Sequence, residues 1–350
     1  MKTVLIDFSR YNEKGGFGEI ANNYSEYVKS GIFEGLRFVA LVKEKYRGAL
    51  GPDIQYVTIE HLDEDLRRVG HIDLWHTTDQ LFIKRRHAAG MVNMLTVHDL
   101  NFLREKKHIH KYKALLKLKW HIMRSDCVTV ISQYAKNDLL AHASVGHKPL
   151  RVIYNGIQGT ENDRQVRPAF AGDDKFFFTL GRICKKKNFH SLVPMMKHFP
   201  DHRLYICGEF YKNKYRACLT QLIHDEGLAD RVFLCGTVTD EERNWLYAHS
   251  DAFLFPSLLE GFGIPVLEAM RFRCKVFSSR CTSLPEVCKD HATYFDSFDP
   301  DDMAATVKDG LAAWNPDSEE AIAAQEYSRK FTYDKYVKQY IALYKELLHV

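Results

Sequence analysis

Short apolar runs alternate with longer amphipathic stretches along the first half of the chain. The run from Thr3 to Phe8 leads into a glycine-rich turn, after which Ile20, Tyr24 and Val28 recur at helical spacing. Comparable runs follow at residues 38–42, 93–97, 128–132 and 151–154. This alternation predicts an α/β domain, in which helices cover both faces of a parallel sheet.

The same rhythm begins again after a polar stretch at residues 159–174, which is rich in Gly, Pro, Asp and Asn and is typical of a linker. The second set of runs covers residues 176–180, 204–207, 232–235, 252–255 and 275–278. We therefore expect two doubly wound domains, residues 1–165 and 166–330. A final segment, residues 331–350, has the apolar spacing of a helix from Tyr333 to Leu348.

Composition agrees with two folded domains. The 350 residues exceed one typical hydrophobic core, and 45% hydrophobic with 27% charged residues excludes a disordered chain. No apolar run approaches the roughly 18 to 20 residues of a spanning helix. The eight cysteines form no Cys-x-x-Cys pair, which favours reduced thiols. These features predict a cytoplasmic chain.

Positive charge is concentrated in the first half, where residues 1–160 hold 24 Lys and Arg against 17 Asp and Glu. Within it, residues 104–124 contain eight Lys and Arg and one Glu, with apolar residues at helical spacing. Such a helix fits peripheral contact with an anionic membrane face. It equally fits a core-facing helix with a solvated basic face. No motif of a nucleic-acid-binding protein accompanies the charge, so we expect no nucleic acid partner.

The segment after the run at 252–255 contains the largest number of candidate binding residues. A loop containing Gly261 and Gly263 precedes Pro265, which we expect to be the first residue of a helix. Helix N-termini bind phosphate through their backbone N–H groups. Glu260 at the loop start and Glu268 in the first helical turn can accept hydrogen bonds from sugar or ribose hydroxyls. The alternative is that both carboxylates only favour the helix dipole.

A second loop, residues 181–188, follows the run at 176–180 and carries Arg182, Lys185, Lys186 and Lys187 before a helix expected near Asn188. Such cations can neutralise a diphosphate leaving group in place of a metal ion. Acidic triplets of the kind that hold a metal occur at residues 63–65 and 299–301. Both are interpreted as helix-start or loop charges, so we expect no metal.

These motifs resemble family 4 glycosyltransferases of the GT-B fold, whose Glu-x7-Glu segment matches residues 260–268. The resemblance covers nearly the whole chain, with Gly-Arg and a Lys five residues further on at Arg182 and Lys187, and His-Asp-Leu at residues 98–100. It implies two Rossmann-like domains facing across a cleft. The sequence departs from it at residues 208–210, Gly-Glu-Phe, where many relatives have Gly-x-Gly-Pro.

The resemblance also implies residue roles. Arg182 and Lys187 would hold the diphosphate, Glu268 the ribose, and Glu260 and His98 the transferred hexose, whereas Lys185 and Lys186 inherit no role. The implied catalytic group is His98, Arg182, Lys187 and Glu260. The implied donor-binding set is Gly16, Arg182, Lys187, Glu260, Gly261, Phe262, Gly263, Ile264, Val266, Leu267 and Glu268.

The activity implied is transfer of a hexose, with retention of configuration and without a metal cofactor, from GDP-mannose or a UDP-hexose. The acceptor would be a saccharide or lipid-linked saccharide in cell-surface polysaccharide synthesis, such as lipopolysaccharide. A GT-B phosphorylase or an epimerase would share the fold. A non-catalytic nucleotide-sugar binding or membrane scaffold protein is the alternative of a different class.

Overall fold

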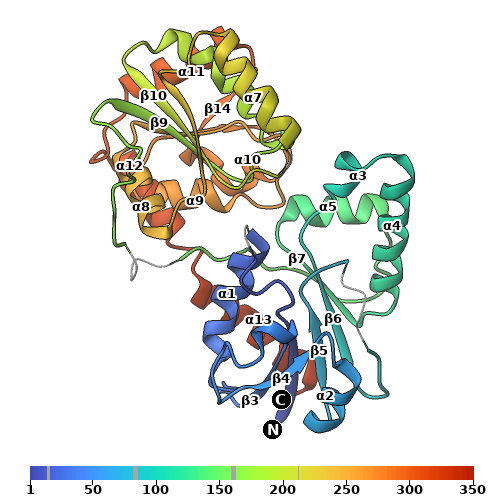
Figure 1. Cartoon of the computed structure of the whole chain (residues 1–350). Coiled ribbons are helices and arrows are strands. Elements are labelled where there is room, and N and C mark those ends of the chain that lie inside the picture. The colour runs from blue at the N-terminus through green and yellow to red at the C-terminus, as the bar shows by residue number, and fades with distance from the viewer. Residues whose placement is uncertain (14–15, 82–85, 159–162, 212) are drawn as a thin grey trace. The chain divides into compact units, whose positions relative to one another are not determined.

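The computed structural model describes residues 1–13, 16–81, 86–158, 163–211 and 213–350, which fall into two compact units (Figure 1). The first unit comprises Met1–Gly156 and Thr332–Val350, and the second Ile157–Phe331. The backbone N–H of Ile157 donates to the carbonyl of Phe331 at 2.7 Å, so the chain enters and leaves the second unit at one point. The boundary expected at residue 165 lies inside the second unit.

The sheet of the first unit has the order β2-β3-β1-β5-β6-β7-β8, with β4 paired to β3. β2 is antiparallel to β3, and the other pairs are parallel. The central strands are buried along almost their whole length, as expected where helices cover both faces. The strands are β1 (Lys2–Asp7), β2 (Ile32–Phe33), β3 (Leu36–Val42), β4 (Gln55–Thr58), β5 (Leu74–Thr77), β6 (Val92–Val97), β7 (Cys127–Val130) and β8 (Leu150–Val152).

The sheet of the second unit has the order β11-β10-β9-β12-β13-β14, and its neighbouring strands pair in parallel. Counted from β9, this is the order 3-2-1-4-5-6 of a Rossmann-type sheet. The doubly wound α/β architecture predicted from the sequence is therefore confirmed. The strands are β9 (Lys175–Leu180), β10 (His202–Cys207), β11 (Val232–Gly236), β12 (Ala252–Phe255), β13 (Val276–Ser279) and β14 (Thr293–Phe295).

Helices flank both sheets (Figure 1). In the first unit they are α1 (Gly16–Val28), α2 (Leu62–Val69), α3 (Phe102–Glu105), α4 (His108–Met123), α5 (Gln133–His142) and α13 (Tyr333–Leu348). In the second they are α6 (Leu192–Met195), α7 (Asn213–Asp225), α8 (Asp240–His249), α9 (Ile264–Arg271), α10 (Leu284–Cys288), α11 (Pro300–Ala312) and α12 (Glu319–Ser328).

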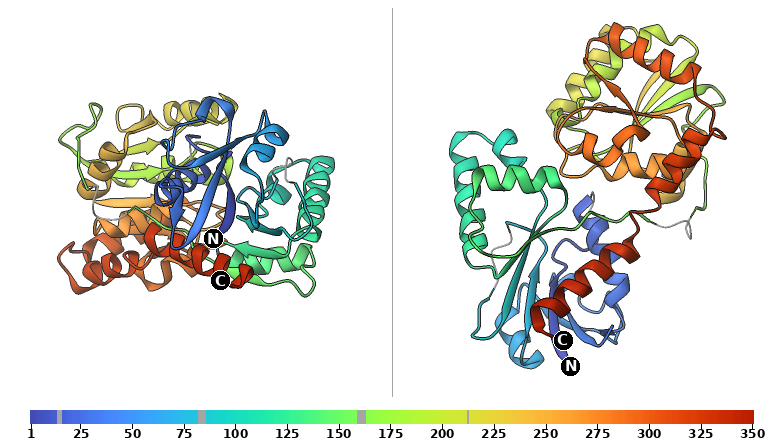
Figure 2. Two further views of the ribbon diagram at one scale, coloured as in Figure 1. Left: turned by 90° about the horizontal axis from the view of Figure 1, so that it is seen from below. Right: turned by 180° about the vertical axis from the view of Figure 1, so that it is seen from behind.

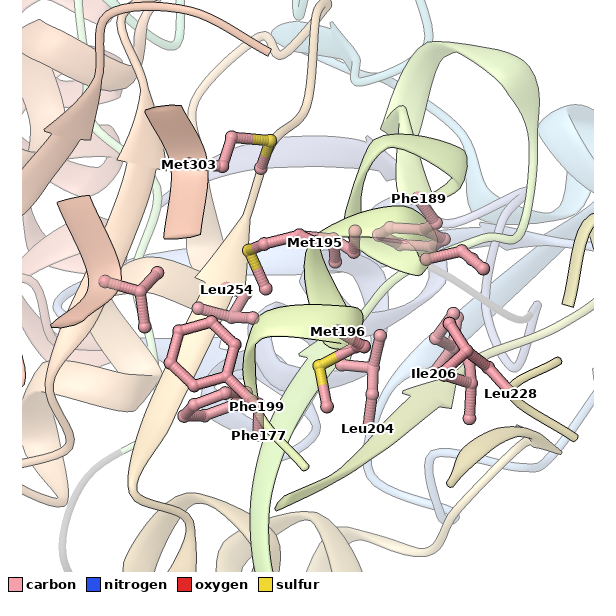
Figure 3. Close-up of a cluster of buried hydrophobic side chains, with 14 of the residues drawn as sticks. Phe177, Phe189, Met195, Met196, Phe199, Leu204, Ile206, Leu228, Leu254 and Met303 are labelled. Atoms are coloured by element: carbon pink, nitrogen blue, oxygen red, sulfur yellow. The ribbon is translucent and has the colours of Figure 1, made fainter. Parts of the chain in front are cut away.

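The core of the second unit lies between the sheet and the helices on one of its faces. Side chains of β9, β10 and β12 pack there against methionines and phenylalanines of the segment around α6 and against α11 (Figure 3). Phe177 and Leu254 are fully buried in this cluster. Burial of this apolar surface stabilises the carboxyl ends of β9 and β12, from which the candidate loops start.

The last helix, α13, closes the first unit and lies beside α1 (Figure 2). The hydroxyl of Tyr344 lies 2.6 Å from the hydroxyl of Tyr24 and 2.6 Å from Nδ1 of His76, and Nε2 of His76 lies 2.7 Å from Oγ1 of Thr96. Both ring nitrogens of this buried, neutral histidine are thus satisfied. Burial, followed by the nearby His98, lowers the pKa of His76 to about 3.

His76 makes the stability of the first unit sensitive to acid. Its folded pKa is depressed from 6.5, so its contribution is complete above pH 6.5 and is lost as the pH falls toward 3. Between pH 6.5 and 5 this group alone should remove about 2 kcal/mol from the free energy of unfolding. We expect the free energy of unfolding of the wild type to fall between pH 7 and pH 5. In His76→Gln, measured by urea unfolding, this fall should be smaller by about 2 kcal/mol. The matched control is His71→Gln, at an exposed histidine, and an unchanged pH response in His76→Gln would contradict the assignment.

Candidate functional site

The two loops singled out in the sequence follow neighbouring strands of the second sheet. β9 pairs with β12, and the strand order reverses between them. Loops at the carboxyl ends of strands form a ligand crevice at such a reversal. The segment after β9 begins at Gly181, and the segment after β12 begins at Pro256. The fold therefore brings the basic loop and the glycine loop to the usual ligand position of this sheet.

Lys187 joins the two loops. Its Nζ lies 2.5 Å from Oε1 of Glu260, and the two side chains are only 10% and 14% exposed. The ammonium group also lies 4.7 Å above the ring of Phe255, at the end of β12. Gly181 makes room for this lysine, since a Cβ there would lie 2.9 Å from Lys187 Cε. Sequence reasoning assigned Lys187 and Glu260 separately, whereas the structure places them in contact.

Backbone hydrogen bonds fix the same arrangement. The N–H of Leu258 donates to the carbonyl of Lys186 at 2.8 Å, and the N–H of Glu260 donates to Oγ1 of Thr282 at 3.0 Å. Oγ of Ser283 donates to the carbonyl of Phe262 at 2.8 Å. A carboxylate and an ammonium group held on tethered loops need little reorganisation when a charged ligand binds.

The helix expected near Asn188 does not begin there. Lys185–Lys187 forms a 3-10 turn, Asn188 has a left-handed backbone with a φ of 57°, and a second 3-10 turn precedes α6. Asn188 thus separates the two turns, as the C-cap of the first and the N-cap of the second. The tight turn is what directs Lys187 inward, while Lys185 stays exposed.

The glycine loop ends in α9, which begins at Ile264, so Pro265 is its second residue and not its first. Gly263 precedes the helix with a φ of 118°, a conformation that favours glycine. The first backbone N–H groups of a helix lack intrahelical partners and suit an anion. The side chains of Phe262, Ile264, Val266 and Leu267 are buried, so these residues can offer a ligand their backbone groups only.

Glu268 is the fifth residue of α9, beyond the first turn in which the sequence placed it. The early start of α9 at Ile264 causes this difference. The side chain is nearly buried, with the residue 4% exposed. Its Oε2 accepts a hydrogen bond from the Tyr247 hydroxyl at 3.1 Å, and its Oε1 lies 3.5 Å from Nη2 of Arg243. A buried carboxylate requires such partners.

Sequence reasoning missed Tyr247 and Arg243. Both belong to α8, about twenty residues before the carboxylate that they hold. The spacing along α8 gave no signal, because i and i+4 residues share one helix face whether they line a site or a core. Only the packing of α8 beside α9 identifies them as neighbours of Glu268.

Arg182 lies at the start of the basic loop and is exposed. Its guanidinium carbon lies 5.2 Å from the ring centre of Tyr211, and its Nε lies 3.9 Å from Oε2 of Glu209. Both partners come from the segment after β10. That segment pairs with the basic loop, since the N–H of Ile183 donates to the carbonyl of Glu209 at 2.8 Å. Arg182 thus keeps an exposed guanidinium, a group suited to binding an anionic ligand.

The remaining candidates, Gly16 and His98, belong to the first unit. His98 follows β6 and is buried, and its Nε2 donates to the carbonyl of Thr78 at 2.8 Å. Burial lowers the pKa of His98, so the ring is neutral near pH 7. Gly16 begins α1, and the next residue, Phe17, lies with its ring centre 4.3 Å from that of His98. The structure thus brings the glycine turn and the histidine together.

The glycine turn contains two further glycines, Gly15 and Gly18. Gly15 lies outside the described residues. A Cβ on Gly18 would lie 1.7 Å from the carbonyl oxygen of Glu13, so only glycine fits this close approach. Oδ1 of Asp99 accepts from the N–H of Asn101 at 2.9 Å. This bond ties the side chain of Asp99 to the backbone of its own loop.

Both acidic triplets lie at helix starts, as interpreted from the sequence. Residues 63–65 form the first turn of α2, where Asp65 accepts from the N–H of Thr58 at 2.9 Å and from Arg47 at 2.7 Å. Asp299 is the N-cap of α11 and accepts from the N–H of Asp301 at 3.0 Å. These contacts give Asp65 and Asp299 structural roles at their helix starts.

Two family models match adjacent segments that together cover most of the chain. The model of Glycosyltransferase Family 4 matches residues 22–159, and that of Glycosyl transferases group 1 matches residues 160–331. The chain belongs to glycosyltransferase family 4. Its two Rossmann-like units are those of the GT-B fold, and the junction of the two matches falls close to the boundary between the units.

Curated relatives of this chain include two O-antigen chain mannosyltransferases. It is 27% identical over 217 residues to the O-antigen chain mannosyltransferase RfbU of Salmonella typhimurium, covering 61% of this chain and 59% of RfbU. It is 37% identical over 175 residues to O-antigen chain mannosyltransferase B of Escherichia coli, covering 48% of this chain and 45% of that protein. The alignments thus span about half the length of these relatives.

Among solved structures, Anabaena HepE in complex with UDP and glucose matches this chain with a TM-score of 0.77. The match has 16% identity and covers 99% of this chain and 100% of HepE. At this identity the likeness establishes the fold.

Proposed function

We propose that this protein transfers a hexose, with mannose favoured, from a nucleotide-diphosphate sugar to a saccharide or lipid-linked saccharide in cell-surface polysaccharide synthesis. The observation that carries the proposal is the contact between Lys187 and Glu260 at the strand reversal of a Rossmann-type sheet. A cation and a carboxylate side by side support this proposal, because a cation suits phosphate and a carboxylate suits hydroxyls. The O-antigen mannosyltransferase relatives support mannose and GDP-mannose as donor, with UDP-hexoses as the next candidates.

In the proposed reaction, the bond between the hexose anomeric carbon and the β-phosphate oxygen breaks as a bond to the acceptor oxygen forms. The nucleoside diphosphate leaves with the electron pair, and the proton of the acceptor hydroxyl passes to an oxygen of the leaving diphosphate. Lys187, Arg182 and the backbone N–H groups at the start of α9 would stabilise the leaving diphosphate without a metal ion. Glu268 would accept hydrogen bonds from the ribose, and Glu260 from the hexose.

The family resemblance also implies roles for His98 and Gly16 of the first unit. His98 is neutral and hydrogen-bonded through Nε2, which suits contact with an uncharged hexose better than with the diphosphate. Gly16 would bring backbone close to the donor. Retention of configuration belongs to this proposal on family resemblance, as does a location in the cytoplasm, at its membrane face for a lipid-linked acceptor.

The rival functions differ in what they release. A transferase frees nucleoside diphosphate only when an acceptor is present, a phosphorylase requires phosphate, and an epimerase frees none. A non-catalytic binding protein would bind donors without turnover. Screening GDP-mannose and UDP-hexoses for thermal stabilisation, then assaying diphosphate release with and without oligosaccharide acceptors, separates these cases.

Glu268→Gln is expected to raise KM for the donor about tenfold with a smaller change in kcat, because one charge-assisted hydrogen bond to the ribose is weakened. Tyr247→Phe should raise KM in the same direction by less, since it frees one oxygen of Glu268 rather than removing its charge. Steady-state kinetics of both variants measure these changes.

A matched control is Glu286→Gln, which neutralises a glutamate of α10 in the same unit. It should leave KM for the donor unchanged. Full activity and wild-type KM in both Glu268→Gln and Arg182→Ala would refute the donor-site assignment.

A further inference from the structure

The helix α4 of the first unit carries apolar side chains on two opposite faces. One face packs into the core: Ala114, Leu118 and Ile122 are buried against β6, β7 and α5. The opposite face carries large apolar side chains that are exposed, namely Ile109 (63%), Tyr112 (51%), Leu116 (66%), Trp120 (40%) and Met123 (66%). The core-facing alternative considered for residues 104–124 is thus wrong for these five residues. We name them the outer stripe.

The outer stripe is continuous. At about 100° per residue its five positions fall within roughly a quarter of the helix circumference. α4 lies at the outside of the first unit in the views of Figures 1 and 2. Leu140 of α5 is 47% exposed and lines one hollow with Lys119, which extends the apolar area beyond α4. Contiguous exposed apolar patches of large side chains mark interaction sites.

Cationic side chains border the outer stripe. Lys113 follows it on one side and Lys119 on the other, both exposed. The guanidinium carbon of Arg124 lies 4.9 Å from the ring centre of Trp120. From residue 106 to 124 the sequence has no acidic residue. The occupant of this surface must therefore accept both apolar contact and a row of positive charges.

We propose that the outer stripe and its lysines bind the surface of an anionic lipid bilayer, with α4 lying parallel to the membrane. Aliphatic side chains can enter the acyl boundary, Trp and Tyr favour the headgroup level, and lysines reach lipid phosphates with their long stems. Among the described residues no helix is both long and apolar enough to cross a bilayer. The surface thus fits lying on the membrane rather than spanning it.

Charge distinguishes a bilayer from a second copy of this chain. Two outer stripes packed together would bring their bordering lysines against each other, and like charges oppose such contact. An anionic lipid surface instead attracts every lysine of the row. This inference rests on α4 and not on the proposed transfer reaction, because vesicle binding is measured without donor or acceptor.

The test is sedimentation of the full-length protein with vesicles of phosphatidylglycerol and phosphatidylcholine, compared with phosphatidylcholine alone. The protein should bind the anionic vesicles, less so at high salt. Leu116→Ser/Trp120→Ser should lower the partition coefficient about a hundredfold, at about tenfold per apolar side chain withdrawn from the bilayer. Lys113→Gln/Lys119→Gln should lower it about twentyfold on anionic vesicles only.

Matched controls are Ile32→Ser and Ile322→Ser, at exposed apolar residues on β2 and α12, and both should bind like the wild type. All replaced residues are exposed, so melting temperatures should be unchanged. The lysine pair gives a second readout if the serine pair fails to fold. Wild-type protein that does not sediment, or variants that bind as well as wild type, would overturn the inference. So would a dimer in analytical ultracentrifugation that Leu116→Ser/Trp120→Ser abolishes while vesicle binding persists.

Discussion

Replacing Lys187 by methionine is expected to lower kcat/KM for sugar transfer about a thousandfold. The ammonium group is held within a largely enclosed site by Glu260 at 2.5 Å and by the ring of Phe255. A preorganised charge at a site with little water stabilises the leaving diphosphate strongly, and removing one such group costs on the order of 10² to 10³ in rate. Methionine keeps the length of the side chain and removes only the charge. Steady-state kinetics with the donor identified by the screen measure the effect.

The matched control is Lys185→Met, in the same 3-10 turn but exposed, which should keep activity within about twofold, since it removes only a screened surface charge. Lys187→Met also leaves the carboxylate of Glu260 without its cation, so a lower melting temperature is expected. Lys187→Met/Glu260→Gln removes that unpaired charge and should recover stability without recovering activity. Activity that returns together with stability would show that Lys187 has a structural role only.

The place in the fold of the donor-side candidates could be predicted, because these residues are contiguous in sequence. Glu260, Gly263 and Glu268 lie on one strand, loop and helix unit, whose type follows from the local apolar pattern and from glycine. The basic loop is recognised in the same way. Local pattern also predicted the extent of α13 from Tyr333 to Leu348. It placed the start of α9 one residue late, at Pro265 instead of Ile264.

Features set by tertiary packing could not be read from local pattern. The strand β5 went unrecognised because His76 and Thr77 interrupt its apolar run, although the network with Tyr344 makes both sides of this strand buried. The unit boundary at Gly156 depends on the pairing of Ile157 with Phe331, far apart in sequence.

The outer stripe of α4 shows the same limit. Apolar spacing predicts an amphipathic helix but does not say which apolar face is buried. Ala114, Leu118 and Ile122 pack into the core because β6 and β7 meet that side of the helix. Leu116 and Trp120 are larger, yet they remain outside.

Gly208→Ala is expected to destabilise the second unit by about 3 kcal/mol, because there is no room for a side chain at position 208. Gly208 has a φ of 134°, and a Cβ there would lie 2.0 Å from the carbonyl oxygen of Gly181. That oxygen belongs to the backbone, so it cannot move away by a change of side-chain rotamer. Relief would require breaking the bond from the N–H of Gly181 to the carbonyl of Cys207 at 3.0 Å. Differential scanning calorimetry or urea unfolding measures the loss.

Gly236→Ala separates this close approach from backbone strain alone. Gly236 has a φ of 73°, also left-handed, but no atom lies within 4 Å of a Cβ built there. Gly236→Ala should therefore lower the free energy of unfolding by only about 1 kcal/mol, the usual penalty for a side chain in the left-handed region. Equal losses in Gly208→Ala and Gly236→Ala would mean that strain accounts for both. A larger loss in Gly208→Ala, with a raised donor KM, would mean that the segment after β10 holds the start of the basic loop in place, where Arg182 must reach the diphosphate.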